Sequence, residues 1–139
     1  MTAKELLEFQ IDDAGYQLDQ VLSGFPEAAM DHKAEGLTMT PRESISHLCE
    51  AYLALDKTIK GEKHEWGTYQ PVDTSTASLL SEMKSLRDSA VAGSLTDDDD
   101  KLKEGHAFIV AHDYYHVGQM CLARLAVEPE WNCYSIYRG

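Results

Sequence analysis

The sequence lacks the features that mark a secreted or membrane-bound protein. Its three cysteines, Cys49, Cys121 and Cys133, are an odd number, and no two of them form a Cys-x-x-Cys pair. No apolar run approaches the roughly 20 residues that a membrane-spanning helix needs, and the first residues do not resemble a signal peptide. We therefore expect a reduced, cytoplasmic protein that has no membrane partner.

Positive charge is also scarce. Lys and Arg number 12 against 24 Asp and Glu, so the formal net charge at pH 7 is −12. A chain of this charge repels nucleic acid, and no basic cluster offsets it, so we expect no nucleic-acid partner. The 139 residues suffice to bury an ordinary core without a disulfide or a structural metal. We expect a single domain that spans residues 1–139.

No strong strand pattern is present, whereas four stretches repeat apolar residues every three or four positions. Thr2-x-x-Glu5 opens the first helix as a capping box, and Thr40-Pro41-x-Glu43 opens the second in the same way. Four such stretches predict an all-α, four-helix bundle. The expected helices lie between Thr2 and Gly24, from Pro41 to about Ile59, from about Ser75 to Ala92, and from the run Asp97–Asp100 to about Val127.

Two long segments separate these helices. We interpret residues 25–39 as a crossing loop after the first helix, with one short helical turn near residues 27–30. Residues 61–74 contain glycines, a proline and two aromatic side chains, Trp66 and Tyr69. Long loops in compact domains often cover a site, and we expect this second loop to do so.

The fourth helix carries two histidines, His112 and His116, on one face. Residues four apart on an α-helix point in nearly the same direction, and both positions continue a mostly apolar seam. Imidazoles that point into a core must be hydrogen-bonded, hydrated or bound to a metal ion. The seam comprises Leu102, Gly105, Ile109, His112, His116, Gln119, Ala123 and Ala126.

His47 on the second helix is the candidate for a third ligand. It lies about 110° around the helix from the apolar stripe, beside Ala51 and Ala54, whose small side chains leave space for the ring. Three imidazoles suit a zinc, nickel or iron ion and leave coordination positions open for water or substrate. The spacing by itself leaves open the alternative of hydrogen-bonded or exposed histidines. Taken alone, His47 also fits an ordinary histidine at the boundary of the core.

Other polar residues have simpler interpretations. His106 lies about 120° around the helix from His112, so it does not join the pair. His32 and His64 fall in loops, where we expect them to be solvated. Glu50, one turn beyond His47, is a candidate general base, although a solvated carboxylate on a helix face is the simpler interpretation.

The sequence also predicts the surroundings of several residues near the histidine pair. Asp113 lies about 100° from His112 and is expected to face water. Gly118 costs a helix about 1 kcal/mol relative to alanine, which indicates either the close approach of another helix or a tolerated small residue. Gln119 is expected to hydrogen-bond a ligand imidazole, with a partly solvated glutamine as the alternative. Three tyrosines are expected in the core rather than in a pocket wall: Tyr52, Tyr114 and Tyr115.

The two histidine segments together resemble the DinB-like superfamily, bundles related to the bacillithiol- and mycothiol-dependent transferases. Members carry a histidine in the second helix, in a context like Ser-Ile-Ser-His47-Leu-Cys-Glu-Ala-Tyr, and the motif His-x-x-x-His-x-Gly-Gln in the fourth. His112, His116, Gly118 and Gln119 match this motif at all four named positions. The resemblance implies that His47, His112 and His116 bind a divalent metal, often zinc or nickel, in a pocket open at one end of the bundle. It also implies a homodimer.

In function, the resemblance implies a metal-dependent thiol S-transferase that acts on a small-molecule substrate with a low-molecular-weight thiol. A metal-dependent hydrolase built on the same bundle, and a non-catalytic dimeric binding or stress-response protein, are the alternatives. A hemerythrin-like oxygen carrier would need further histidine and carboxylate ligands, including a His-x-x-x-Glu pair that the sequence lacks.

Overall fold

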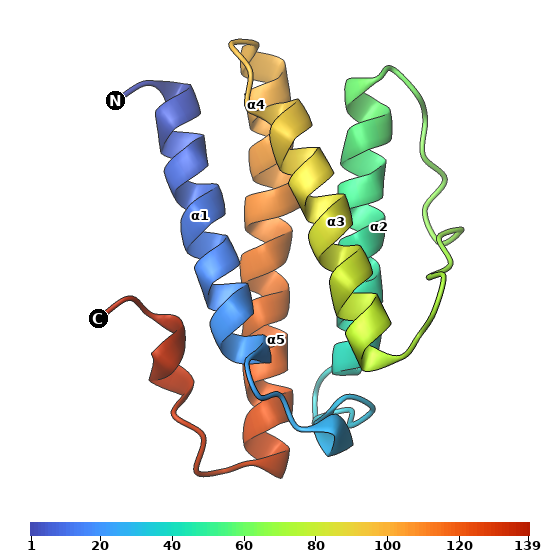
Figure 1. Ribbon diagram of the computed structural model, residues 1–139, viewed down its shortest axis with the longest axis vertical. Coiled ribbons are helices and arrows are strands. Elements are labelled where there is room, and N and C mark those ends of the chain that lie inside the picture. The colour runs from blue at the N-terminus through green and yellow to red at the C-terminus, as the bar shows by residue number, and fades with distance from the viewer.

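The computed structural model describes residues 1–139 and contains helices but no strands (Figure 1). The predicted all-α, four-helix bundle is therefore confirmed. The fourth long helix consists of α4, the π-helical turn η2 and α5, which follow one another without a break. None of the helices combines the length and the apolar character that crossing a bilayer requires. The elements are α1 (Ala3–Leu22), η1 (Glu27–Ala29), α2 (Pro41–Ile59), α3 (Thr76–Ser94), α4 (Asp99–Gly105), η2 (His106–Val110), α5 (Ala111–Val127) and η3 (Cys133–Ile136).

The two predicted capping boxes open α1 and α2. The Thr2 hydroxyl accepts a hydrogen bond from the Glu5 N–H at 3.1 Å, and the Glu5 carboxylate accepts one from the Thr2 N–H at 2.7 Å. Thr40 and Glu43 form the same reciprocal pair at 3.2 and 3.1 Å. Each box satisfies N–H groups that the first turn of a helix leaves unpaired, so both helix starts are set by local sequence.

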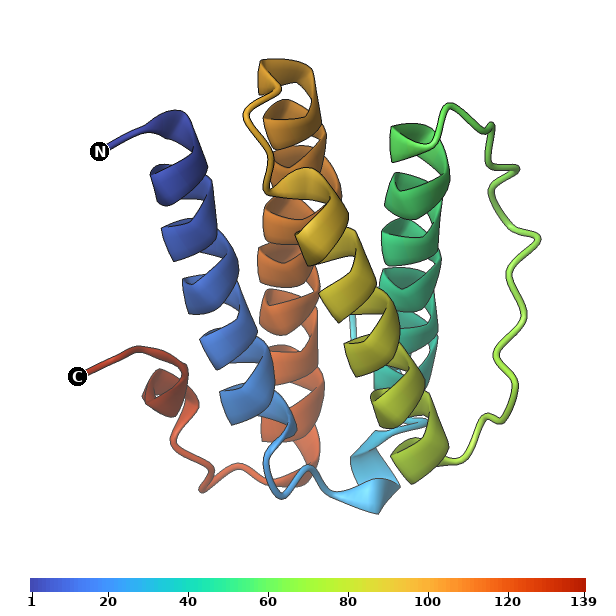
Figure 2. The ribbon, with the colours of Figure 1, turned by 45° about the horizontal axis from the view of Figure 1, so that its top comes forward.

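The helices do not follow a simple up-and-down order. α1 and α2 make no extensive contact, and the segment between them crosses one end of the bundle and carries η1 (Figures 1 and 2). The predicted crossing loop after the first helix is therefore present. α2 and α3 pack side by side and run in the same direction, because residues 60–75 run the length of the bundle before α3 begins. This second loop passes along the outside of α2, the helix that carries His47.

The apolar stripes of the helices meet in one core. The apolar residues that recur every three or four positions in the first three helices are buried, apart from Ile59 and Leu86, which are half-buried against the core. Each fully buried aliphatic side chain stabilises the fold by about 1.5–3 kcal/mol. The buried residues of these stripes are Leu7, Ile11, Ala14, Leu18, Val21, Ile45, Leu48, Tyr52, Leu55, Leu79, Met83 and Ala90.

A buried polar network joins all four long helices. The Asp113 carboxylate of α5 is fully buried and accepts hydrogen bonds from the Tyr52 hydroxyl of α2 and, at 2.9 Å, from Arg87 Nε of α3. The Arg87 guanidinium also donates to the Ile11 carbonyl oxygen of α1 at 2.8 Å. Gly15 permits this approach, because a Cβ there would lie 3.1 Å from Arg87 Nη1. The expectation that Asp113 faces water is therefore wrong.

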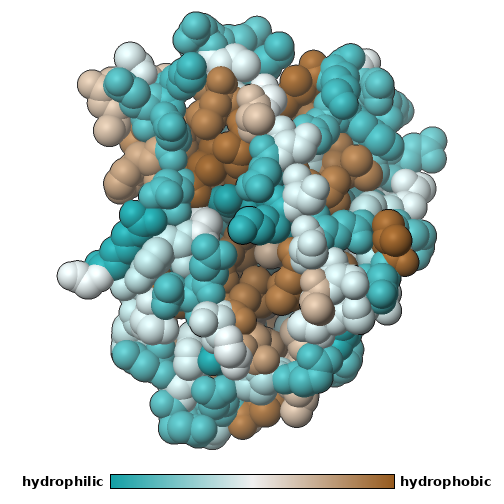
Figure 3. Space-filling model, in the orientation of Figure 1, coloured by the Kyte–Doolittle hydropathy of each residue, from teal (hydrophilic) through white to brown (hydrophobic).

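Arg87 explains why a carboxylate can point inward at this position. α1 and α3 make no extensive contact, and a groove of about 680 Å³, lined by both apolar and charged side chains, lies between them (Figure 3). Arg87 spans this groove and reaches the buried carboxylate. Burial raises the pKa of Asp113, while the adjacent guanidinium acts in the opposite direction and stabilises the carboxylate. A buried charge is tolerated when it is paired and fully hydrogen-bonded, as it is here.

Replacing Asp113 by asparagine should destabilise the fold by about 3–5 kcal/mol, because the Arg87 cation would lose its counter-charge while staying largely buried. Urea unfolding followed by circular dichroism measures this change. Removing both charges together, with Asp113→Leu and Arg87→Met, should recover a large part of the loss. A loss below about 1 kcal/mol for Asp113→Asn would show that the pair does not hold the helices together.

Candidate metal centre

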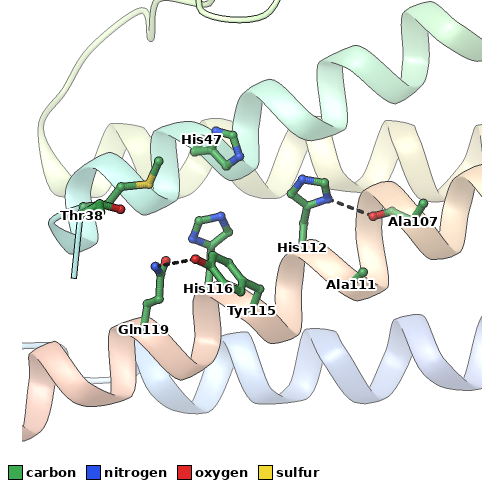
Figure 4. Close-up of a pocket in the computed structure, with 9 residues that line it drawn as sticks. Thr38, His47, Ala107, Ala111, His112, Tyr115, His116 and Gln119 are labelled. Carbon is green, nitrogen blue, oxygen red and sulfur yellow. Dashed lines mark hydrogen bonds between the residues drawn. The ribbon is translucent and has the colours of Figure 1, made fainter. Parts of the chain in front are cut away.

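The three predicted ligand histidines lie together in the structure. His47 of α2 faces His112 and His116 of α5 (Figure 4). The ring centroids are 5.1 Å apart for His47 and His116 and 5.8 Å apart for His47 and His112. The three rings line an open pocket of about 310 Å³ between the two helices. The other lining residues are Thr38, Met39, Ala107, Ala111, Tyr115 and Gln119.

Burial favours the neutral form of His47 and His116. His116 is 1% exposed, and burial, together with the charge that His47 would carry, lowers its pKa to about 4, although a contact with Gln119 acts in the opposite direction. Burial and His112 also lower the pKa of His47, against an opposing effect of Glu50. Neutral imidazole is the form that binds a metal ion, so these donors are available at neutral pH.

The hydrogen bonds of the cluster leave ring nitrogens free for a ligand. His112 Nδ1 lies 2.9 Å from the Ala107 carbonyl oxygen, so we assign the N–H to Nδ1 and the lone pair to Nε2. His116 Nδ1 and Gln119 Oε1 are both buried and neither has a hydrogen-bonding partner, whereas Gln119 Nε2 donates to the Tyr115 hydroxyl at 3.3 Å. Buried polar atoms without partners are rare, and two of them in one pocket indicate a binding site.

The donor set fits a divalent transition metal, but the rings are not arranged around a single point. No three His, Cys, Asp or Glu side chains are placed to hold one metal ion together. Two imidazoles that bind one ion at about 2.1 Å in a tetrahedral arrangement have centroids about 5 Å apart, which matches the 5.1 Å between His47 and His116. Binding by all three would therefore require the His112 ring to move toward the other two.

The turn η2 makes the fourth helix different from the uninterrupted helix that the sequence predicts. The Ala111 N–H donates to the His106 carbonyl oxygen five residues back, which is one residue more than in an α-helical turn. Ala107, whose carbonyl orients the His112 ring, lies in this turn. π turns within α-helices occur frequently at functional sites, and this one lies directly beside the cluster.

The close approach of helices occurs at Gly105 and not at Gly118. A Cβ at Gly105 would lie 2.8 Å from the Cβ of Ser94 at the end of α3. Gly118 is exposed, and no atom lies within 4 Å of the place that its Cβ would occupy. The close helix approach predicted at Gly118 is therefore absent within this chain.

Glu50 fastens the loop between α2 and α3 to the side of α2. Its carboxylate accepts hydrogen bonds from the N–H groups of Gly67 at 3.1 Å and Tyr69 at 3.0 Å, and it lies 3.2 Å from His64 Nε2. Glu50 is 7% exposed and the His64 side chain 3% exposed, so the expectation that both are solvated is wrong. A carboxylate accepts several hydrogen bonds at once, which lets this loop pack against the helix without regular backbone partners.

The fastened loop places Trp66 beside the histidines. The Trp66 ring lies 6.0 Å from His47 and stacks on Phe108 of η2, with centroids 6.1 Å apart and an angle of 16° between the planes. Phe108 stacks in turn on His112 at 6.2 Å. Trp66 stays 50% exposed, so an accessible aromatic wall borders the cluster. The loop expected to cover a site therefore lies against His47.

Sequence reasoning missed part of this site. Phe108 lies four residues before His112, and that helical spacing was the available signal for the aromatic wall. Tyr115, which was expected in the core, is 64% exposed and lines the pocket, whereas Tyr52 is in the core as predicted. His106 is exposed and stays outside the cluster, as expected.

Comparison of the chain with known protein families, with curated proteins and with solved structures found no match. The resemblance to the DinB-like superfamily therefore stays a prediction that rests on His47 and on the residues from His112 to Gln119. The three-histidine cluster is observed in the structure and does not depend on that resemblance.

Replacing Glu50 by glutamine should loosen the loop and destabilise the fold by about 1–3 kcal/mol at pH 7, because the amide keeps only one of the two acceptor oxygens and loses the negative charge that strengthens these hydrogen bonds. Burial by itself would raise the pKa of Glu50, but the N–H groups of Tyr69 and Gly67 and the His64 ring outweigh it and hold the pKa below the usual 4.5. The carboxylate thus stabilises the fold above about pH 4.5, and this contribution disappears as the pH falls through the lowered pKa.

Urea unfolding at pH 7 and at pH 3 checks this prediction, and hydrogen exchange at the Gly67 and Tyr69 amides locates the effect. Glu62→Gln, which neutralises an exposed carboxylate of the same loop, is the matched control and should leave both quantities unchanged. Equal stability of wild type and Glu50→Gln at pH 7 would contradict the role given to this carboxylate.

Proposed function

We propose that the protein binds one divalent transition-metal ion through His47, His112 and His116. The observation that supports this most strongly is the meeting of three imidazoles from two helices at one open pocket. Zinc and nickel suit a set of three neutral nitrogen donors, and iron is a further candidate. Gln119, whose buried oxygen is unpaired in the same pocket, would orient the His116 ring.

We further propose that the site transfers a low-molecular-weight thiol to an electrophilic small molecule. A divalent ion, when bound, would supply positive charge that favours the deprotonated form of a thiol. The sulfur would then form a bond to the electrophilic carbon, and the leaving group would depart with its electron pair. No lysine or arginine lines the pocket, so the chain itself offers no other cation to a thiolate.

The size of the pocket and the aromatic surface beside it suit small substrates. Its volume of about 310 Å³ lies at the lower end of the range for ligand sites. Trp66 and Phe108 present a flat apolar surface beside the histidines, on which an uncharged part of a substrate can pack. No cysteine lines the pocket, and burial raises the pKa of Cys49 to about 12, so in this proposal the nucleophilic sulfur comes from a second ligand. Free cysteines also agree with the reduced, cytoplasmic location that we propose.

The state of Glu50 favours thiol transfer over hydrolysis. Many hydrolases use a carboxylate as the base that takes a proton from water, and no carboxylate lines the pocket. Glu50, the candidate base of α2, is already occupied by Gly67, Tyr69 and His64. The lack of a separate base equally supports the second candidate function, a non-catalytic binding or stress-response protein that keeps the metal site.

Wild-type protein that is stripped with a chelator and offered zinc or nickel should take up about one ion per chain, as measured by elemental analysis. His112→Ala should weaken this binding at least about 100-fold. The substitution removes a proposed metal ligand, and removing even a residue that hydrogen-bonds a ligand costs about 10–100-fold in affinity. His106→Ala removes an exposed histidine from the same long helix and should bind as wild type does. Wild-type protein that stays metal-free under these conditions would overturn the proposed site.

The fluorescence of Trp66 gives a second readout that needs no activity. Its ring centroid lies 6.0 Å from that of His47, so nickel bound at the site should quench its emission. Trp131, the other tryptophan, stacks on Arg124 and should not respond. Quenching should therefore persist in Trp131→Phe and disappear in Trp66→Phe.

Metal-loaded protein given a panel of low-molecular-weight thiols and a chromogenic electrophile should form a thioether product. Removal of the metal, or His116→Ala, should lower the rate at least about 100-fold, while His106→Ala should leave it unchanged. Hydrolysis of ester or amide substrates without any thiol would favour the hydrolase. Ligand binding without turnover would favour the non-catalytic protein.

A further inference from the structure

The histidine cluster has surroundings of different chemistry on its different sides. Trp66 borders His47, and Phe108 stacks on His112, so this side is aromatic. The Tyr115 ring meets the His116 ring edge-on, with centroids 5.1 Å apart. A side chain there can offer a substrate hydrogen bonds as well as apolar surface. The polar residues that line the pocket besides the histidines are Thr38, Tyr115 and Gln119 (Figure 4).

The Gln119 amide contacts both Tyr115 and His116 (Figure 4). Its Nε2 donates to the Tyr115 hydroxyl oxygen at 3.3 Å, whereas its Oε1 is buried and has no partner. His116 Nδ1 is also buried without a partner. A neutral imidazole that carries its proton on Nδ1 can donate to such an oxygen, and its Nε2 then keeps the lone pair that a metal ion needs. The observed orientation of the amide therefore agrees with His116 as a ligand through Nε2.

This orientation of the amide leaves the proton of the Tyr115 hydroxyl without a partner in the chain. The hydroxyl oxygen accepts from Gln119 Nε2, and its O–H donates to no other residue. The reverse orientation would turn Nε2 toward His116 Nδ1, so the imidazole proton would have to sit on Nε2, where it blocks metal binding. The orientation that suits a metal ligand is thus the one in which Tyr115 is free to donate into the pocket that it lines.

We propose that the Tyr115 hydroxyl donates a hydrogen bond to an uncharged carbonyl oxygen of the thiol substrate and so determines which thiols bind. Tyr115 is 64% exposed, so water takes this bond in the free protein and a ligand oxygen can replace it. No lysine or arginine lines the pocket and the net charge is −12, so the chain offers no counter-charge to a carboxylate there. The electrophile then packs on the aromatic side, at Trp66 and Phe108. This inference rests on the proposed thiol transfer.

Titration calorimetry of the zinc-loaded full chain with three small thiols tests the contact. Mercaptopropionamide carries an uncharged carbonyl oxygen, mercaptopropionate carries a carboxylate in its place, and propanethiol has no oxygen. Wild-type protein should bind mercaptopropionamide about 5-fold more tightly than propanethiol, which is the size of effect expected of one uncharged hydrogen bond. Mercaptopropionate should bind no more tightly than the amide.

Tyr115→Phe removes the hydroxyl and keeps the ring. This variant should still take up zinc and should bind propanethiol as wild type does, but its affinity for mercaptopropionamide should fall to that for propanethiol. A purely structural effect would weaken the binding of both thiols alike, so the loss of the preference is the informative readout. Tyr134→Phe makes the same change at a tyrosine of the C-terminal tail that is 74% exposed, and it should keep the preference.

Two results would overturn the role of Tyr115 and leave the proposed metal site and thiol transfer standing. One is zinc-loaded wild-type protein that binds mercaptopropionamide and propanethiol equally well. The other is a preference for the amide that survives in Tyr115→Phe. Mercaptopropionate that binds most tightly of the three would contradict the uncharged acceptor. Wild-type protein that takes up no zinc, or that binds none of the three thiols once loaded, would overturn the proposed function and this inference with it.

Discussion

The buried pair of Asp113 and Arg87 is the contact on which the arrangement of the helices depends. Three helices meet at the Asp113 carboxylate and its partners, and Arg87 extends the network to the backbone of α1. Asp113 directly follows His112, so this pair also fixes the rotation of α5 about its own axis. With Asp113 held toward Tyr52, the two histidines turn toward α2. One ion pair therefore decides which residues of α5 reach the pocket.

Three residues of α2, within less than two turns of the helix, make three different contacts. His47 faces the pocket, Glu50 holds the loop, and the Tyr52 hydroxyl meets Asp113 in the core. These residues point in three directions around the helix, since three and five positions correspond to about 300° and 140°. The loop, the core and the histidine cluster thus all contact the same short piece of α2. Because this piece carries His47 and also binds the loop through Glu50, it sets the position of Trp66 relative to His47.

The parts of the fold that depend on neighbouring residues could be predicted from the sequence. The capping boxes at Thr2 and Thr40 and the apolar stripes involve residues a few positions apart, and the same is true of the His112 and His116 pair. Asp113 was misplaced because its partner, Arg87, lies 26 positions away on a helix whose parallel course no local pattern reveals. Glu50 and His64 were misplaced for the same reason, since they are buried only by a loop that folds back along α2. The joining of His47 with the pair was predictable only through the resemblance and through the space left by small neighbours.

An α-helix that contains a π turn holds one more residue than a regular helix of the same course. Removing one residue from His106–Val110 would let this segment return to regular geometry while the helix on either side kept its orientation. A deletion between His112 and His116 would instead rotate everything after it by about 100° and carry His116 away from His47. The chain thus has one short stretch in which its length can change without turning the histidines. That stretch includes Ala107, so a change of length there would free the His112 ring while leaving the helix in place.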